Sequence, residues 1–177
     1  MDLQRQLSYL IQEGRTWVRS QQNRYRNVGL PLSSQERKVV DPFFGATTID
    51  AVRVCWVDVI ENPPFYGGLP QTVQSVLIDF RQMAGITFVD TVLLARPKIA
   101  QSDSMSLIFH ECVHVVQYQT LGVDNFVEQY VRGWAENGMV YDNIPLERIA
   151  YQLEERFKSA SEAPFFVEAE IRIRLRS

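Results

Sequence analysis

The most regular hydrophobic pattern in the chain lies just before Gly122. Apolar residues recur there at intervals of three and four, the spacing of one face of an α-helix. Ser102 or Asp103 can cap its amino end, and Gly122 follows the pattern at a position where glycine commonly ends helices. The pattern predicts one helix with a packed face at Met105, Ile108, Phe109, Cys112, Val113 and Val116.

The amino-terminal segment, residues 2–25, has a second amphipathic pattern. It is rich in arginine and poor in acidic residues, which is typical of transit peptides and of helices on membrane surfaces. It lacks the apolar core of a secretory signal, so we favour an ordinary packed helix. Its apolar side carries Leu3, Leu7, Leu10, Ile11, Trp17 and Val18.

Four more segments have helical signals. A short helix is predicted in residues 33–45, where Pro42 and Gly45 end it. Helices are also predicted in residues 71–85, 124–137 and 141–157. In the last of these, Asp142 or Asn143 can cap the helix, Pro145 suits its first turn, and the packing face is Leu146, Ile149, Ala150 and Leu153.

Strand patterns are fewer. Residues 49–60 alternate and are rich in β-branched side chains, and residues 86–96 form a strand or a hairpin. The alternating end of the chain, residues 165–177, suits either an edge strand or a helix. We therefore expect an α+β fold, with a small sheet beside a mostly helical carboxy-terminal half.

Composition restricts the function. The chain has 177 residues, which predicts a single domain over 1–177, and its net charge of −3 argues against nucleic-acid binding. Cys55 and Cys112 are too few for a disulfide framework, and Cys112 should face the core. There is no secretory signal and no apolar run long enough to span a bilayer, so we expect a cytoplasmic location. The oligomeric state is left open.

The only histidines, His110 and His114, lie four residues apart with Glu111 beside the first. Each residue advances about 100° around a helix, so all three side chains fall within one sector. Two imidazoles one turn apart can bind a single Zn²⁺, and a neighbouring carboxylate can activate a water on that ion. This pattern favours a zinc site over a coincidental motif.

A third ligand must be a carboxylate, because no histidine remains. The metzincin extension is absent, since Gln117 and Thr120 stand where its glycine and third histidine would be. Glu147 is favoured because it lies in the first turn of a predicted helix, near the small Ala150. The candidates are Asp124, Glu128, Glu136, Asp142, Glu147 and Glu154, with Asp142 and Asp124 the main rivals of Glu147.

The stretches HECVHVVQYQTLG and YDNIPLERIAYQLE resemble zincin metallopeptidases of the gluzincin type. In particular, they are similar to bacterial zincin-like domains related to the core domain of extracellular contractile injection systems. The resemblance covers about residues 85–157. It implies His110, His114 and Glu147 as ligands, Glu111 as the catalytic base, and a sheet whose edge strand borders the metal helix. Many gluzincins place an aspartate four residues after the ligand glutamate, where Tyr151 stands here, so a supporting carboxylate is expected to be missing.

The expected activity is hydrolysis of peptide bonds in a peptide or protein substrate, by a zinc-bound water that Glu111 activates. The oxyanion donor is expected among Tyr141, Tyr151, Tyr118 and Arg148. Residues 86–96 could pair with an extended peptide or form an internal hairpin. The alternative function is a noncatalytic zincin-like domain, in which zinc or the fold has a binding or structural role.

Overall fold

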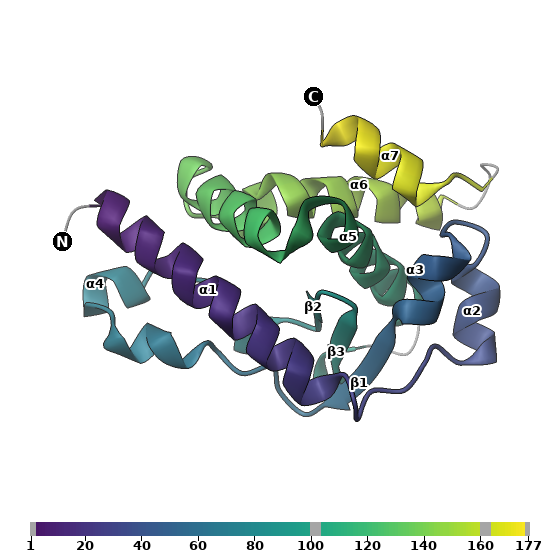
Figure 1. Cartoon of the computed structure of the whole chain (residues 1–177), viewed down its shortest axis with the longest axis horizontal. Helices are drawn as coiled ribbons and strands as arrows, with labels where there is room; N and C mark the ends of the chain where they lie inside the picture. The colour runs from purple at the N-terminus through teal and green to yellow at the C-terminus, as the bar shows by residue number, and fades with distance from the viewer. Residues whose placement is uncertain (1–2, 100–103, 160–163, 176–177) are drawn as a thin grey trace.

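The computed structural model describes residues 3–99, 104–159 and 164–175, and the described part is an α+β fold (Figure 1). Helices predominate, and one three-stranded sheet lies among them. The helices and strands are α1 (Leu3–Tyr25), α2 (Ser34–Val40), α3 (Ala46–Ala51), β1 (Arg53–Val57), α4 (Gln71–Gln74), β2 (Gly85–Phe88), β3 (Thr91–Ala95), α5 (Ser104–Glu136), α6 (Pro145–Lys158) and α7 (Val167–Arg174).

The sheet has the order β1-β3-β2, with β1 parallel and β2 antiparallel to β3. All five residues of the central strand β3 are buried. The predicted segment 86–96 is thus a hairpin, and β2 forms an edge of the sheet. The predicted strand 49–60 is wrong at both ends, because residues 49–51 belong to α3 and the strand stops at Val57. A distant carboxylate explains the first error, since Glu168 accepts hydrogen bonds from Gly45 N at 2.8 Å and Thr48 Oγ1 at 2.8 Å.

The predicted helix over residues 71–85 is also wrong. Only the one-turn α4 and a 3₁₀ turn at Phe80–Gln82 form there. Asn62 holds the second part of the segment in a tight turn. Its side-chain amide donates to Asp79 Oδ1 at 2.8 Å and accepts from the backbone N–H of Phe80 at 2.8 Å. These contacts compete with helical hydrogen bonds.

Helix α5 contains the predicted break at Gly122, which has φ 73° and ψ 164°. That conformation is essentially restricted to glycine. We call residues 104–121 the first half of α5 and residues 123–136 the second half. The proposed caps Ser102 and Asp103 lie outside the described residues, whereas Cys112 is fully buried as expected.

Helix α6 begins at Pro145, as predicted, and packs closely on α5. The cap is Ile144, with no side-chain hydrogen bond, so the predicted caps Asp142 and Asn143 are wrong; these two belong to a short 3₁₀ turn. A Cβ atom at Gly133 would lie 2.6 Å from Cδ of Pro145, so glycine permits this close approach. The contact brings the first turn of α6 to α5.

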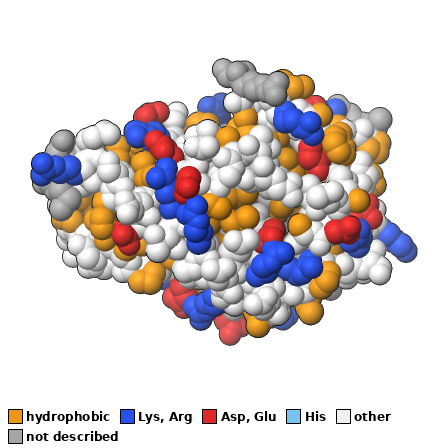
Figure 2. Space-filling view, viewed as in Figure 1, with side chains coloured by type: hydrophobic (Ala, Val, Ile, Leu, Met, Phe, Trp, Pro, Cys, Tyr) orange, Lys and Arg blue, Asp and Glu red, His pale blue; other side chains and the backbone are white. Residues whose placement is uncertain are grey.

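The two ends of the chain are both helical in the described residues. Leu10, Ile11, Trp17 and Val18 of α1 are buried, which confirms an ordinary packed helix. Its Arg15 and Arg19 pair with Glu128 and Asp124 of α5, and Figure 2 shows charges of both signs interspersed on this face. The carboxy-terminal segment is the helix α7 rather than an edge strand. No helix in the described ranges has the length and apolar character to cross a bilayer.

Candidate metal centre

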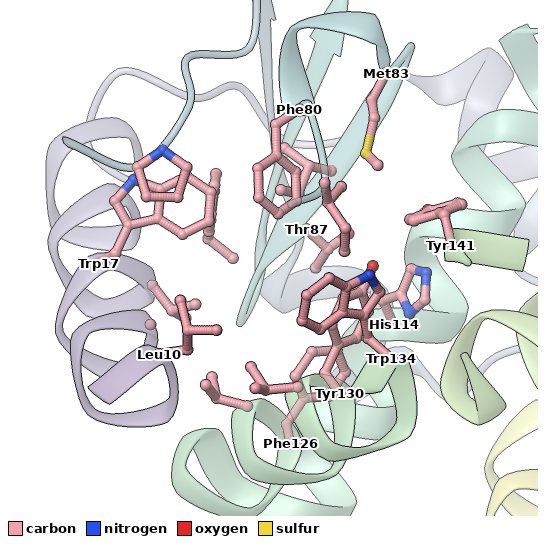
Figure 3. Close-up of a pocket in the computed structure, with 18 of the residues that line it drawn as sticks. Leu10, Trp17, Phe80, Met83, Thr87, His114, Phe126, Tyr130, Trp134 and Tyr141 are labelled. Atoms are coloured by element: carbon pink, nitrogen blue, oxygen red, sulfur yellow. The ribbon is translucent and has the colours of Figure 1, made fainter. Parts of the chain in front are cut away.

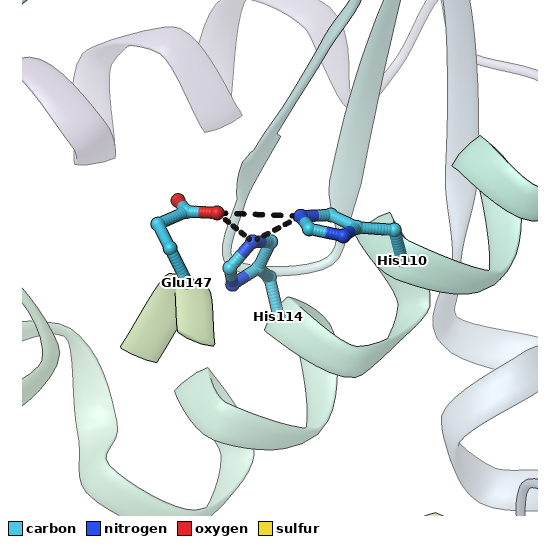
Figure 4. A group of neighbouring side chains, drawn as sticks. All are labelled: His110, His114 and Glu147. Carbon is cyan, nitrogen blue, oxygen red and sulfur yellow. Dashed lines mark hydrogen bonds and ion pairs between the residues drawn. The ribbon is translucent and has the colours of Figure 1, made fainter. Parts of the chain in front are cut away.

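Three side chains from two helices point toward one another (Figure 4). His110 and His114 come from the first half of α5, and Glu147 comes from the first turn of α6. The Nε2 atoms of the histidines lie 3.1 Å apart, and each lies 3.3 Å from Oε2 of Glu147. The three residues are only 3–5% exposed. The fold therefore brings together the two histidines and the favoured carboxylate.

Hydrogen bonds on the outer side of each ring fix its tautomer. His110 Nδ1 lies 3.1 Å from Oε2 of Glu154, and His114 Nδ1 lies 2.8 Å from Oε1 of Gln117. The Gln117 amide nitrogen donates to the backbone carbonyl of Leu146 at 2.9 Å, which leaves its oxygen as an acceptor. In both rings Nδ1 therefore carries the proton that is donated. The Nε2 lone pairs are then directed at each other and at a carboxylate oxygen.

Three lone pairs at this separation suit a small cation. With bonds of about 2.0–2.1 Å, ligand atoms at tetrahedral angles around zinc lie about 3.3–3.4 Å apart. The observed separations of 3.1–3.3 Å are close to this value. Nitrogen donors also disfavour calcium and magnesium. This buried group could hold a metal ion.

Without an ion, the same arrangement favours a proton on the imidazole nitrogens. Burial lowers the pKa of His110, but hydrogen bonds with Glu147 and Glu154 outweigh burial and raise the pKa to about 10. Burial raises the pKa of Glu147, yet the two histidines bring it well below its ordinary range. The carboxylate is thus ionised, and protons and a cation compete for the imidazole nitrogens.

The other candidate ligands are directed elsewhere. Asp124 pairs with Arg19, Glu128 pairs with Arg15 and Arg132, and Asp142 and Glu136 are exposed. Glu154 is not one of the three converging ligands. It contacts Nδ1 of His110, on the opposite side of the ring from Nε2.

The expectation that a supporting carboxylate is missing is therefore wrong. Glu154 lies seven positions after Glu147, two turns along α6, and so points to the same side of that helix. Lys158 Nζ contacts its other oxygen at 2.7 Å. Tyr151, at the position where an aspartate was sought, instead places its ring 4.7 Å from the ring of His110. Spacing on the helix face could have identified Glu154.

Glu111 lies beside the group without belonging to it. Its Oε2 accepts a hydrogen bond of 2.7 Å from Thr87 Oγ1 on β2. A Cβ atom at Gly85, also on β2, would lie 2.5 Å from Oε1 of Glu111. The edge strand thus leaves room for the carboxylate and fixes its position. Burial raises the pKa of Glu111, which favours a role as a proton acceptor.

Two tyrosines reach the ligand carboxylate: Tyr141, which the sequence singled out and whose hydroxyl hydrogen-bonds with Glu147, and Tyr130, which it did not. Tyr130 donates from its hydroxyl to Oε1 of Glu147 at 2.7 Å. Tyr141 lines the adjacent cavity, and Tyr151 is partly exposed. Tyr118 is buried and stacks on Phe126, with centroids 3.6 Å apart. Arg148, another candidate donor, is exposed.

An apolar cavity of about 110 Å³ adjoins the group (Figure 3). His114, Glu147 and Thr87 lie at its polar end, and Figure 3 shows Leu10 and Trp17 of α1 on the other side. A second hollow of about 560 Å³ shares Met83, Gly85, Trp134 and Tyr141 with it. The ligand group therefore borders space that a molecule could enter.

Comparison with known proteins gives no match, whether to a family model, to a curated protein or to a solved structure.

Proposed function

We propose that this chain is a zinc-dependent peptidase with a zincin-like arrangement of its metal helix and edge strand. The observation that carries the proposal is the combination of three converging ligand atoms with Glu111 placed next to them but outside the ligand set. A purely structural zinc site usually has four protein ligands and needs no adjacent base. Here the described residues offer three, which suits a site that also binds water or substrate.

The edge strand gives further support. Thr87 and Gly85 of β2 contact Glu111, so the strand runs next to the base. A peptide that lay along the sheet edge formed by β2 would bring its backbone to the same place. This placement agrees with the gluzincin resemblance of the sequence.

In this mechanism, zinc supplies Lewis acidity, which polarises a peptide carbonyl and makes water more acidic. His110, His114 and Glu147 would hold the ion. Glu111 accepts the proton of the attacking water at its carboxylate and delivers it to the leaving amine. Thr87 keeps that carboxylate oriented through its 2.7 Å hydrogen bond. Glu154 and Gln117 maintain the imidazole tautomers.

The test is Glu111→Gln, which preserves size and removes the base. Both proteins should contain about one zinc per chain by elemental analysis, because Glu111 is not a ligand. Hydrolysis of an unfolded protein or a peptide library should fall by about 10²–10⁴-fold. Glu155→Gln is the matched control, since Glu155 is exposed on α6 and its variant should keep full activity.

Two outcomes would contradict the proposal. Hydrolysis that persists in Glu111→Gln would come from another protease. If fully zinc-loaded wild type cleaves nothing, the chain has a noncatalytic role, in which the ion or the fold serves binding or structure. The deep burial of the ligands, at 3–5% exposure, is the observation that favours this second function.

A further inference from the structure

Trp134 lines the cavity and carries a polar atom that has no hydrogen-bond partner within the described part of the chain. The indole nitrogen of Trp134 is buried and makes no hydrogen bond to any group of the described residues. The whole side chain is 5% exposed. Buried N–H groups in native proteins are nearly always paired, because an unpaired one destabilises the fold. The exception therefore needs an explanation.

The position of Trp134 provides one. It lines both the apolar cavity and the second hollow. Figure 3 shows it on the same side of the cavity as His114 and Tyr130. Tyr130, its neighbour one turn earlier on α5, already donates to Glu147. Trp134 is thus a donor beside the metal centre that no described protein group satisfies.

The rest of the cavity defines what could satisfy it. The walls of the cavity are mainly aromatic and aliphatic, with Leu10, Trp17, Phe80, Met83 and Phe126 among them. A charged ligand would lose its hydration there without compensation. An uncharged oxygen attached to an apolar group would instead gain both the hydrogen bond and apolar contacts.

We propose that Trp134 donates its indole N–H to a carbonyl oxygen of the ligand, and that this ligand carries a bulky apolar group in the cavity. The inference rests on the proposed function in one respect, that the ligand is the substrate. It then specifies the substrate class as peptides with a large apolar side chain next to the bound carbonyl. Trp134 would orient that carbonyl at the metal centre.

The hydrogen bond from Trp134 is tested by measuring how two probe molecules bind to wild type and to Trp134→Phe. Benzylacetone and butylbenzene have similar shapes, but only the first has a carbonyl oxygen. The ratio of ketone to butylbenzene affinity should be about five- to tenfold higher in wild type than in Trp134→Phe, the change expected for one hydrogen bond. Both proteins must strip water from the ketone carbonyl, so this cost cancels in the comparison. Trp17→Phe is the matched control, because Trp17 lines the same cavity and loses the same atoms, and it should keep the wild-type ratio.

The titrations are followed by NMR of the indole N–H groups, with chelator present so that no metal contributes. On addition of the ketone, the Trp134 proton should move downfield in wild type. This readout needs neither hydrolysis nor a variant that folds, so a chain that cleaves nothing can still support the proposal.

Three results would overturn the proposal. The first is an equal ketone preference in wild type and Trp134→Phe. The second is no binding of either probe. The third is a Trp134 proton that already shows a bound water in the free protein and does not respond to the ketone.

Discussion

The first and second halves of α5 both lie next to the candidate metal centre, but they present different kinds of side chain to it. In the first half, the polar groups near the site are paired: His110 with Glu154, His114 with Gln117, and Glu111 with Thr87. The second half presents aromatic rings and the unpaired N–H of Trp134. Paired polar groups fix the three candidate ligand atoms, whereas the N–H without a partner among the described residues is where we propose that a ligand binds. The two halves would then have separate roles, the first in holding an ion and the second in recognising a ligand.

The largest effect should come from His114→Ala, which removes a ligand from the first half. We expect this variant to lose its zinc, because two protein ligands remain. Free zinc at a thousand times its Kd should stabilise wild type by about 4 kcal/mol, and the variant should gain little. Thermal unfolding with zinc and with chelator measures the difference.

Trp134→Phe is the control from the second half and should keep its zinc, because all three ligands remain. Equal zinc content in His114→Ala and wild type would show that the ion binds elsewhere. The first half of α5 would then not be the part that holds the ion.

A smaller effect is expected from Gly85→Ala, which tests the strand that supports the first half. The added Cβ would meet Glu111 Oε1 at 2.5 Å, so the base must move. A displacement of about 1 Å can cost about 10²-fold in rate, and the strained contact should cost about 1–3 kcal/mol of stability. Kinetics and thermal unfolding measure both, with zinc content unchanged.

Gly67→Ala is the matched control for this change. A Cβ at Gly67 meets nothing within 4 Å, so activity and stability should stay near wild type. If Gly85→Ala behaves like Gly67→Ala, the edge strand does not position Glu111.

The smallest effect should come from Glu154→Gln, which weakens the support of His110. Loss of an outer partner typically lowers metal affinity by about 10–100-fold. Competition with a chelator of known affinity measures this change. Glu155→Gln alters the next, exposed residue and should leave zinc affinity unchanged. Equal affinities in the two variants would mean that the Glu154 contact does not tune the ion.

Local signals predicted the helices that carry the ligand group. The periodicity before Gly122 and the Pro145 start of α6 are both properties of short segments, and they place His110, His114 and Glu147 on helices. Contacts between distant segments could not be predicted in the same way. The turn at Phe80 depends on Asn62, and α3 depends on Glu168, 123 positions from Gly45. Sequence alone gives no signal for such pairings.

The same limit applies within the site. The support of Glu111 by Thr87 spans 24 positions and joins a strand to a helix, so no periodicity reveals it. Tyr130 was missed for a related reason, because its contact with Glu147 depends on the close packing that Gly133 permits. The Trp134 N–H became informative only when its surroundings showed that it had no partner.

The connection between the ligand helices also has a consequence for how the chain folds. His110 and Glu147 are 37 positions apart, and only the second half of α5 and a short turn separate their helices. The entropy lost in closing a loop grows only with the logarithm of its length, so a loop of this size closes at modest cost. An ion that joins its ends would favour the α5–α6 hairpin before the 123-position contact between Gly45 and Glu168 has formed. The metal centre would then act as an early crosslink in the folding chain.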